Sequence, residues 1–89
     1  MSQAHGNPEE LRIFASALEH YLNILQEETG RLDGAFNQLG DTWNDQKRQE
    51  FEEVYQQLRG ALNAFHEQAQ NQIPHLQQLA TDLETYLSR

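Results

Sequence analysis

The 89-residue sequence contains no cysteine, only two prolines and five glycines, and few basic residues. Without cysteine the chain can form neither a disulfide nor a thiolate metal site, and it has no cysteine nucleophile. So few prolines and glycines leave little room for a turn-rich β protein. Six basic residues against fourteen acidic ones disfavour nucleic-acid binding, which requires clustered Lys and Arg. The length fits a single domain, residues 1–89.

Long hydrophobic runs are also missing from the sequence. No stretch of about 18 apolar residues could span a bilayer, so we expect no stable membrane insertion. Residues 1–8 contain neither a basic start nor an apolar stretch, so we expect no cleavable signal peptide. Export of this chain would therefore need a route that does not read a cleavable leader.

Heptad spacing of apolar residues predicts a first helix over about residues 8–39. Asn7 can cap this helix, and Pro8 suits its first position. Leucine then recurs at every seventh residue, and aromatic or small apolar residues fill the intermediate positions. Because residues three and four apart share a helix face, these side chains form one apolar stripe. Its members are Leu11, Phe14, Leu18, Tyr21 or Leu22, Leu25, Leu32, Ala35 or Phe36, and Leu39.

A second helix is predicted over about residues 46–87, after a turn at residues 40–45. Gly40 is expected to cap the end of the first helix, and Asn44 or Asp45 the start of the second. The second stripe alternates steps of four and three and is interrupted only by Gln72. It consists of Phe51, Tyr55, Leu58, Leu62, Phe65, Ala69, Leu76, Leu79, Leu83 and Tyr86.

Pro74 lies inside the second predicted helix but off its apolar stripe. A proline there removes one backbone hydrogen bond and crowds the preceding turn of the helix. We expect a kink near residue 74 within one bent helix, in preference to two separate helices.

A short turn between two long helices forces them to run antiparallel, so the fold class is an all-α helical hairpin. Further apolar residues flank the two stripes, and two helices alone cannot cover them. We therefore expect two hairpins to associate into a four-helix bundle. The flanking residues are Ile13, Ala17, Ile24, Val54, Ala61 and Ile73.

No catalytic or metal-binding set is recognisable, and we expect no enzymatic activity, metal site or cofactor. The residues three before His20, His66 and His75 are not carboxylates, so the Glu-x-x-His pairs of a di-iron bundle are missing. His66-Glu67 begins like a zinc-protease helix, but Gln70 occupies the position of the second histidine.

Trp43, the only tryptophan, falls in the predicted turn, where a polar connector would be ordinary. Two interpretations remain open. Its ring can pack over the end of the hairpin against Phe36, Leu39 or Phe51, or part of it can stay exposed as an anchor for another protein. A position at the rim could serve both purposes.

The length, the two long helices and the tryptophan between them resemble the WXG family, the small helical-hairpin substrates of type VII (ESX) secretion. The matching segment runs from Leu39 through Trp43 to Asp45, followed by Phe51. The family's Trp-x-Gly reads Trp43-Asn44-Asp45 here, which suggests a divergent branch. The family's C-terminal Tyr-x-x-x-Asp/Glu signal is incomplete, because only three residues follow Tyr86.

The resemblance implies a homodimer or a heterodimer with a paired small hairpin, recognised by a type VII secretion ATPase and secreted without a leader. It implies a secreted effector or adaptor in which Trp43, Asp45 and Phe51 bind protein. The alternative is a cytosolic (cytoplasmic) coiled-coil adaptor or structural subunit unrelated to secretion. In either case the hairpin seam and dimer interface are expected to use Leu11, Phe14, Leu18, Leu25, Leu32, Leu39, Leu58, Leu62, Phe65, Leu76, Leu79 and Leu83.

Overall fold

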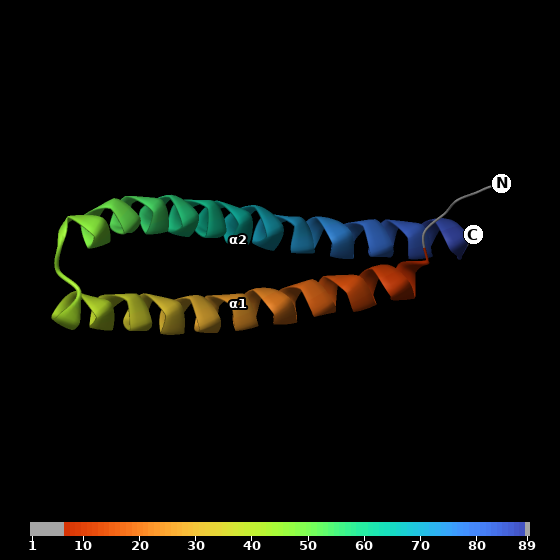
Figure 1. Cartoon of the computed structure of the whole chain (residues 1–89). Coiled ribbons are helices and arrows are strands. Elements are labelled where there is room, and N and C mark those ends of the chain that lie inside the picture. The colour runs from red at the N-terminus through yellow and green to blue at the C-terminus, as the bar shows by residue number, and fades with distance from the viewer. Residues whose placement is uncertain (1–6, 89) are drawn as a thin grey trace.

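The computed structural model describes residues 7–88, which form two long α-helices joined by a short turn. Helix α1 spans Pro8–Thr42 and helix α2 spans Gln46–Leu87. They run antiparallel and side by side over their whole length (Figure 1). The expected all-α hairpin is confirmed. α2 is one unbroken helix with Pro74 inside it, as expected.

Both helices begin at a residue whose side chain satisfies free backbone N–H groups. The Asn7 side-chain oxygen accepts hydrogen bonds from the N–H groups of Glu9 at 2.8 Å and Glu10 at 3.3 Å. At the start of α2 it is Asp45, not Asn44, that caps. Its carboxylate accepts a hydrogen bond from the Arg48 N–H at 3.1 Å.

The end of α1 differs from the expectation that Gly40 caps it. The helix continues to Thr42, and the turn is confined to residues 43–45. Trp43 is the C-terminal cap, and its N–H donates to the Leu39 carbonyl at 2.6 Å. Gly40 is thus a helical residue. Its lack of a side chain serves another purpose, because a Cβ there would lie 3.0 Å from a terminal nitrogen of Arg48.

The best-buried apolar cluster lies in the half of the hairpin next to the chain termini. Ala15 and Leu22 of α1 meet Ile73 of α2, and Leu18, Leu25, Ala69 and Leu76 pack around them. Ile73 is 8% exposed. Its predicted place on the exposed flank is therefore wrong, whereas Ile13, Ala17, Ile24, Val54 and Ala61 are exposed as expected.

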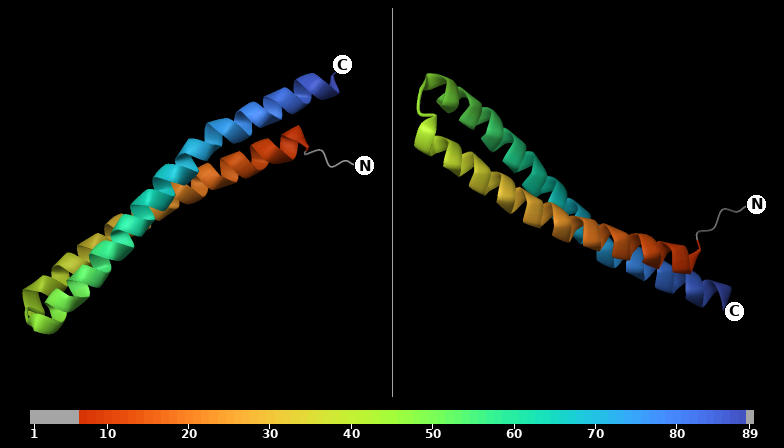
Figure 2. Two further views of the ribbon diagram at one scale, coloured as in Figure 1. Left: turned by 90° about the horizontal axis from the view of Figure 1, so that it is seen from above. Right: turned by 60° about the horizontal axis from the view of Figure 1, so that its bottom comes forward.

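The hairpin is far longer than a compact domain of its size. Its radius of gyration is 19.9 Å, whereas a globular chain of this length would have about 12 Å. It measures 66 × 20 × 18 Å, and both helices follow one gentle bend (Figure 2). Neither helix, over the residues the structure describes, is long and apolar enough to cross a membrane.

Candidate functional site: an apolar face and a tryptophan turn

In both halves of the hairpin, the contact between the two helices combines apolar packing with polar contacts. In the turn half, Asp33 of α1 occupies a contact position opposite Tyr55 and Arg59 of α2. Its carboxylate accepts a hydrogen bond from the Tyr55 hydroxyl and another, at 2.8 Å, from Nε of Arg59. We call these three side chains, which join the two helices, the polar lock.

The polar lock shifts the acidity of its members. The Arg59 guanidinium, together with the Tyr55 hydroxyl, holds the pKa of Asp33 below its ordinary value of 3.8. Burial of the tyrosine ring, and then the neighbouring carboxylate, raises the pKa of Tyr55 above 10.0. Asp33 is therefore ionised at neutral pH while Tyr55 keeps its proton.

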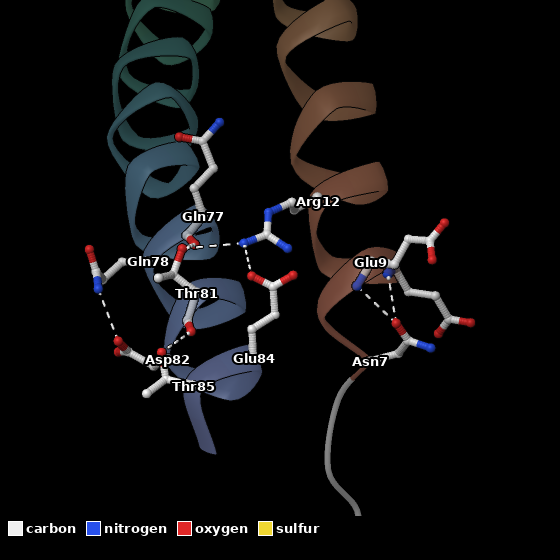
Figure 3. A network of polar contacts seen from close by, with 10 residues as sticks. Asn7, Glu9, Arg12, Gln77, Gln78, Thr81, Asp82, Glu84 and Thr85 are labelled. Carbon is white, nitrogen blue, oxygen red and sulfur yellow. Dashed lines mark hydrogen bonds and ion pairs between the residues drawn. The ribbon is translucent and has the colours of Figure 1, made fainter. Parts of the chain in front are cut away.

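A second polar bridge joins the helices near the termini (Figure 3). Arg12 of α1 donates to Glu84 at 2.7 Å and to the Thr81 hydroxyl at 3.3 Å, both on α2. The hydrogen bond from Arg12 lowers the pKa of Glu84 below its ordinary value of 4.5. Both side chains are exposed, and exposed ion pairs contribute little to stability.

Large apolar side chains remain exposed along one side of the hairpin. On α2 these side chains recur at every seventh residue, and Gln72 is the one polar residue in the series. On α1 a second series with the same spacing contains Glu28 as its polar residue. Seven-residue spacing keeps side chains on one side of a helix. We call this side the apolar face. Its residues are Phe14, Tyr21, Leu32, Ala35 and Leu39 of α1 and Phe51, Leu58, Phe65, Leu79 and Tyr86 of α2.

A groove of about 400 Å³ runs between the helices in the turn half of the apolar face. Its walls are almost wholly apolar. Five of its lining residues belong to the apolar face, and the floor is made by Phe36 and Tyr55, whose rings stack 4.4 Å apart. The face residues are Leu32, Ala35, Leu39, Phe51 and Leu58. The groove is open to solvent and can receive another apolar surface.

Trp43 closes the turn end of the hairpin and is half-buried. Its ring lies 6.2 Å from that of Phe51, which in turn lies 6.0 Å from Phe36. The guanidinium of Arg48 stacks over the Phe36 ring at 5.1 Å, beside Gly40. The ring of Trp43 therefore packs against Phe51 while the residue stays partly exposed, and its role as an anchor for another protein stays a prediction.

The structure divides the predicted seam residues into two groups of equal size. Leu11, Leu18, Leu25, Leu62, Leu76 and Leu83 are half-buried where the helices meet, whereas Phe14, Leu32, Leu39, Leu58, Phe65 and Leu79 lie exposed on the apolar face. Of the three predicted protein-binding residues, Trp43 and Phe51 are in contact, and Asp45 caps α2 two residues from Trp43.

Sequence reasoning placed Tyr55 on the apolar stripe of the second helix but missed Asp33 and Arg59, which form the polar lock with it. A signal was available, because Arg48, Tyr55, Leu62, Ala69 and Leu76 share a seven-residue series that runs along the contact. No group of three or more histidine, cysteine, aspartate or glutamate residues that could hold a metal occurs within residues 7–88.

These features define a class of protein: a small helical hairpin with an aromatic turn and an exposed apolar face. A family model described as "Proteins of 100 residues with WXG" matches residues 3–86. The chain therefore belongs to the WXG100 family, whose members are small proteins associated with type VII secretion. No curated protein and no solved structure matches it.

Proposed function

We propose that this chain is a non-enzymatic effector or adaptor of a type VII secretion system, exported in folded form without a cleavable leader. It acts by pairing through the apolar face and by presenting its turn end to the secretion ATPase. The observation that carries the proposal is the exposed apolar face beside Trp43 in a chain of the WXG100 family.

The apolar face supports pairing because monomeric proteins rarely expose apolar surface of this extent. Its side chains remain 43–64% exposed in the isolated hairpin, apart from the small Ala35. A second hairpin placed on them would complete the four-helix bundle expected from the sequence.

The turn end supports recognition by a second protein. Trp43, Asp45 and Phe51 lie together at one tip of a rod 66 Å long, away from most of the apolar face. Tryptophan is enriched among residues that dominate binding energy, and its half-buried ring is held in place by Phe51. Trp43 and Asp45 lie outside the apolar face, so a partner can bind them while that face is paired.

The test is secretion of an epitope-tagged chain by a bacterium with an active type VII system, compared with an isogenic strain lacking its ATPase. We expect the chain in the medium only when the ATPase is present. Trp43→Ala should reduce export at least tenfold while the purified variant keeps its helical content. Ile24→Ala, at an exposed position of α1 outside the apolar face and far from the tip, is the control for the loss of a large apolar side chain.

Equal secretion with and without the ATPase would contradict the proposal, as would full export of Trp43→Ala. An unexported chain that stays with cytosolic partners would favour the alternative, a coiled-coil adaptor unrelated to secretion.

A further inference from the structure

We infer that the hairpin has a built-in opening point in its middle, at which residues 33–59 loosen as a unit while the rest of the two helices stays packed. We call residues 33–59 the turn unit. The inference concerns the hairpin itself and depends neither on export nor on pairing. It is carried by the distribution of buried residues, by three glycines and by the position of the polar lock.

The buried side chains of the hairpin form two groups with a gap between them. Four of them lie in the terminal half, and the other two, Phe36 and Tyr55, lie in the turn half. No residue is buried within 23–35 of α1 or 56–72 of α2, two ranges that the structure describes in full. We call these two ranges the middle section. Half-buried and exposed residues alone connect the two packed groups.

A polar pocket occupies part of the middle section. Its volume is about 320 Å³, and it is open to solvent. Most of its lining residues are polar, among them Thr29, Arg59 and His66, each of which is half-buried. Polar side chains gain little by staying together beside solvent, because water offers them equivalent hydrogen bonds. The helices are therefore held together more weakly here than at the apolar cluster.

Three glycines weaken the helices themselves in the middle section. Gly30 and Gly34 of α1 and Gly60 of α2 are helical and exposed. A Cβ added at any of the three would meet no other group within 4 Å, so packing does not require glycine there. Glycine inside a helix favours the unfolded backbone. Gly34 follows Asp33 and Gly60 follows Arg59, so the hydrogen bond between those two side chains places the weakened stretches side by side.

The polar lock closes the hairpin at this point. Asp33 of α1 accepts hydrogen bonds from Tyr55 and Arg59 of α2. The other hydrogen bonds between the two helices, within residues 7–88, are those of Arg12 near the termini. The lock is therefore the polar contact that must break before the turn unit loosens.

Loosening of the turn unit moves the tip without unfolding the terminal half. The rings of Trp43, Phe51, Phe36 and Tyr55 follow one another in contact, so the aromatic packing of the tip ends at a member of the lock. The apolar cluster around Ile73 belongs to the other packed group. Such an opening of one part of a fold has a lower free energy than global unfolding.

Trp43 is the only tryptophan, so its fluorescence reports on the turn unit alone. Urea unfolding of the purified full-length chain is followed by this fluorescence and by helical circular dichroism in the same samples. The inference expects the fluorescence midpoint at a lower urea concentration, because different probes coincide only when the whole chain unfolds at once. The triple variant Gly30→Ala/Gly34→Ala/Gly60→Ala should bring the two midpoints together.

The matched control places three alanines at exposed helical positions of the terminal half. These changes also raise helix propensity, but they should leave the gap between the two midpoints as wide or wider. The substitutions are Ser16→Ala, His20→Ala and Gln77→Ala.

Hydrogen exchange locates the opening along the chain. Amides of the turn unit should exchange at least about tenfold faster than those of residues 15–22 and 73–80. Asp33→Asn, which weakens the lock, should speed exchange in the turn unit by about a further tenfold and leave the two terminal ranges unchanged. Glu84→Gln, which weakens the Arg12 bridge instead, should not change exchange in the turn unit.

Coincident fluorescence and dichroism transitions in the parent chain would overturn the inference, as would equal exchange along both helices. An Asp33→Asn variant whose exchange rises equally in both halves would overturn it as well, because the hairpin would then open only as a whole. None of these results bears on export, which tests the proposed function separately.

Discussion

At the scale of single residues, the polar lock is the feature that depends most on exact chemistry. Asp33 is the acceptor for two donors from the other helix, Tyr55 and Arg59. Replacing Asp33 leaves both donors without their acceptor. The loss of stability should therefore exceed that for an exposed polar group without partners. The lock also makes the stability of the hairpin depend on pH.

The expected pH dependence follows from the lowered pKa values of Asp33 and Glu84. Both carboxylates bind protons less readily in the folded chain than in the unfolded chain, so they stabilise the fold above their ordinary values of 3.8 and 4.5. This stabilisation is lost as the pH falls through the lower, folded-state pKa. The midpoint temperature of thermal unfolding should therefore decrease as the pH is lowered from 6 to 2.

Asp33→Asn isolates the contribution of the lock to that change. The variant should unfold at a lower temperature than the parent at pH 7, and its midpoint should fall less between pH 6 and pH 2. Asp41→Asn, at an exposed position outside the lock, serves as the control and should behave as the parent does. Parallel pH curves for Asp33→Asn and the parent would show that the lock contributes nothing.

Gly40 provides a second test at the residue scale, because it is helical and lies against Arg48. Replacing a helical glycine by alanine normally stabilises a helix by about 1 kcal/mol. In the parent, the new Cβ would crowd the guanidinium that stacks on Phe36, so we expect Gly40→Ala to stabilise by less than about 0.5 kcal/mol. In an Arg48→Ala background the full gain should return, as measured by urea unfolding. Equal effects in both backgrounds would contradict the contact.

At the scale of the helices, the seven-residue spacing predicted both elements and their antiparallel course. It could not show which edge of each stripe turns toward the other helix. Leu58 and Leu62 are both on the predicted stripe, yet Leu62 lies at the contact and Leu58 on the apolar face. Because the stripe is wider than the contact, tertiary packing decides which of its residues face the other helix, and the small Ala15 and Ala80 are buried there.

The end of α1 was unpredictable for a related reason. A glycine after the last leucine is an ordinary sign of a helix end, but Arg48, eight residues further on, folds back beside Gly40. The caps Asn7 and Asp45 could be predicted because a cap acts within a few residues of its own position.

Leu22 tests the packing within one hairpin. It is 2% exposed in the apolar cluster around Ile73. Leu22→Ala should therefore cost about 2–4 kcal/mol of unfolding free energy, as buried large-to-small changes do. The adjacent exposed change Asn23→Ala should alter it by less than about 0.5 kcal/mol. A small effect at Leu22 would mean that the register of α1 differs from the one described.

Pro74 tests the continuity of α2. The residue is exposed within the helix, and its ring removes one backbone hydrogen bond. Pro74→Ala should restore that bond and stabilise the hairpin by about 1–3 kcal/mol, with a small rise in helical circular dichroism. A destabilised variant would show instead that the proline itself is required for packing.

At the scale of the whole molecule, the hairpin is built with two unlike sides. The polar bridges hold α1 against α2 along one edge, while the apolar face on the other side remains exposed. A rod 18–20 Å thick has too little interior to bury both stripes. Association would remove the apolar face from water, so under the proposed pairing the folding of the hairpin and its association are linked.

That linkage is tested most directly by thermal unfolding of the parent chain at protein concentrations from 1 to 100 µM. Because association favours only the folded state, the unfolding midpoint should rise with concentration, by several degrees over this range. Leu58→Ala should weaken that dependence more than Leu22→Ala does, since Leu58 lies on the apolar face. A midpoint independent of concentration, with the hairpin fully folded throughout, would contradict the account.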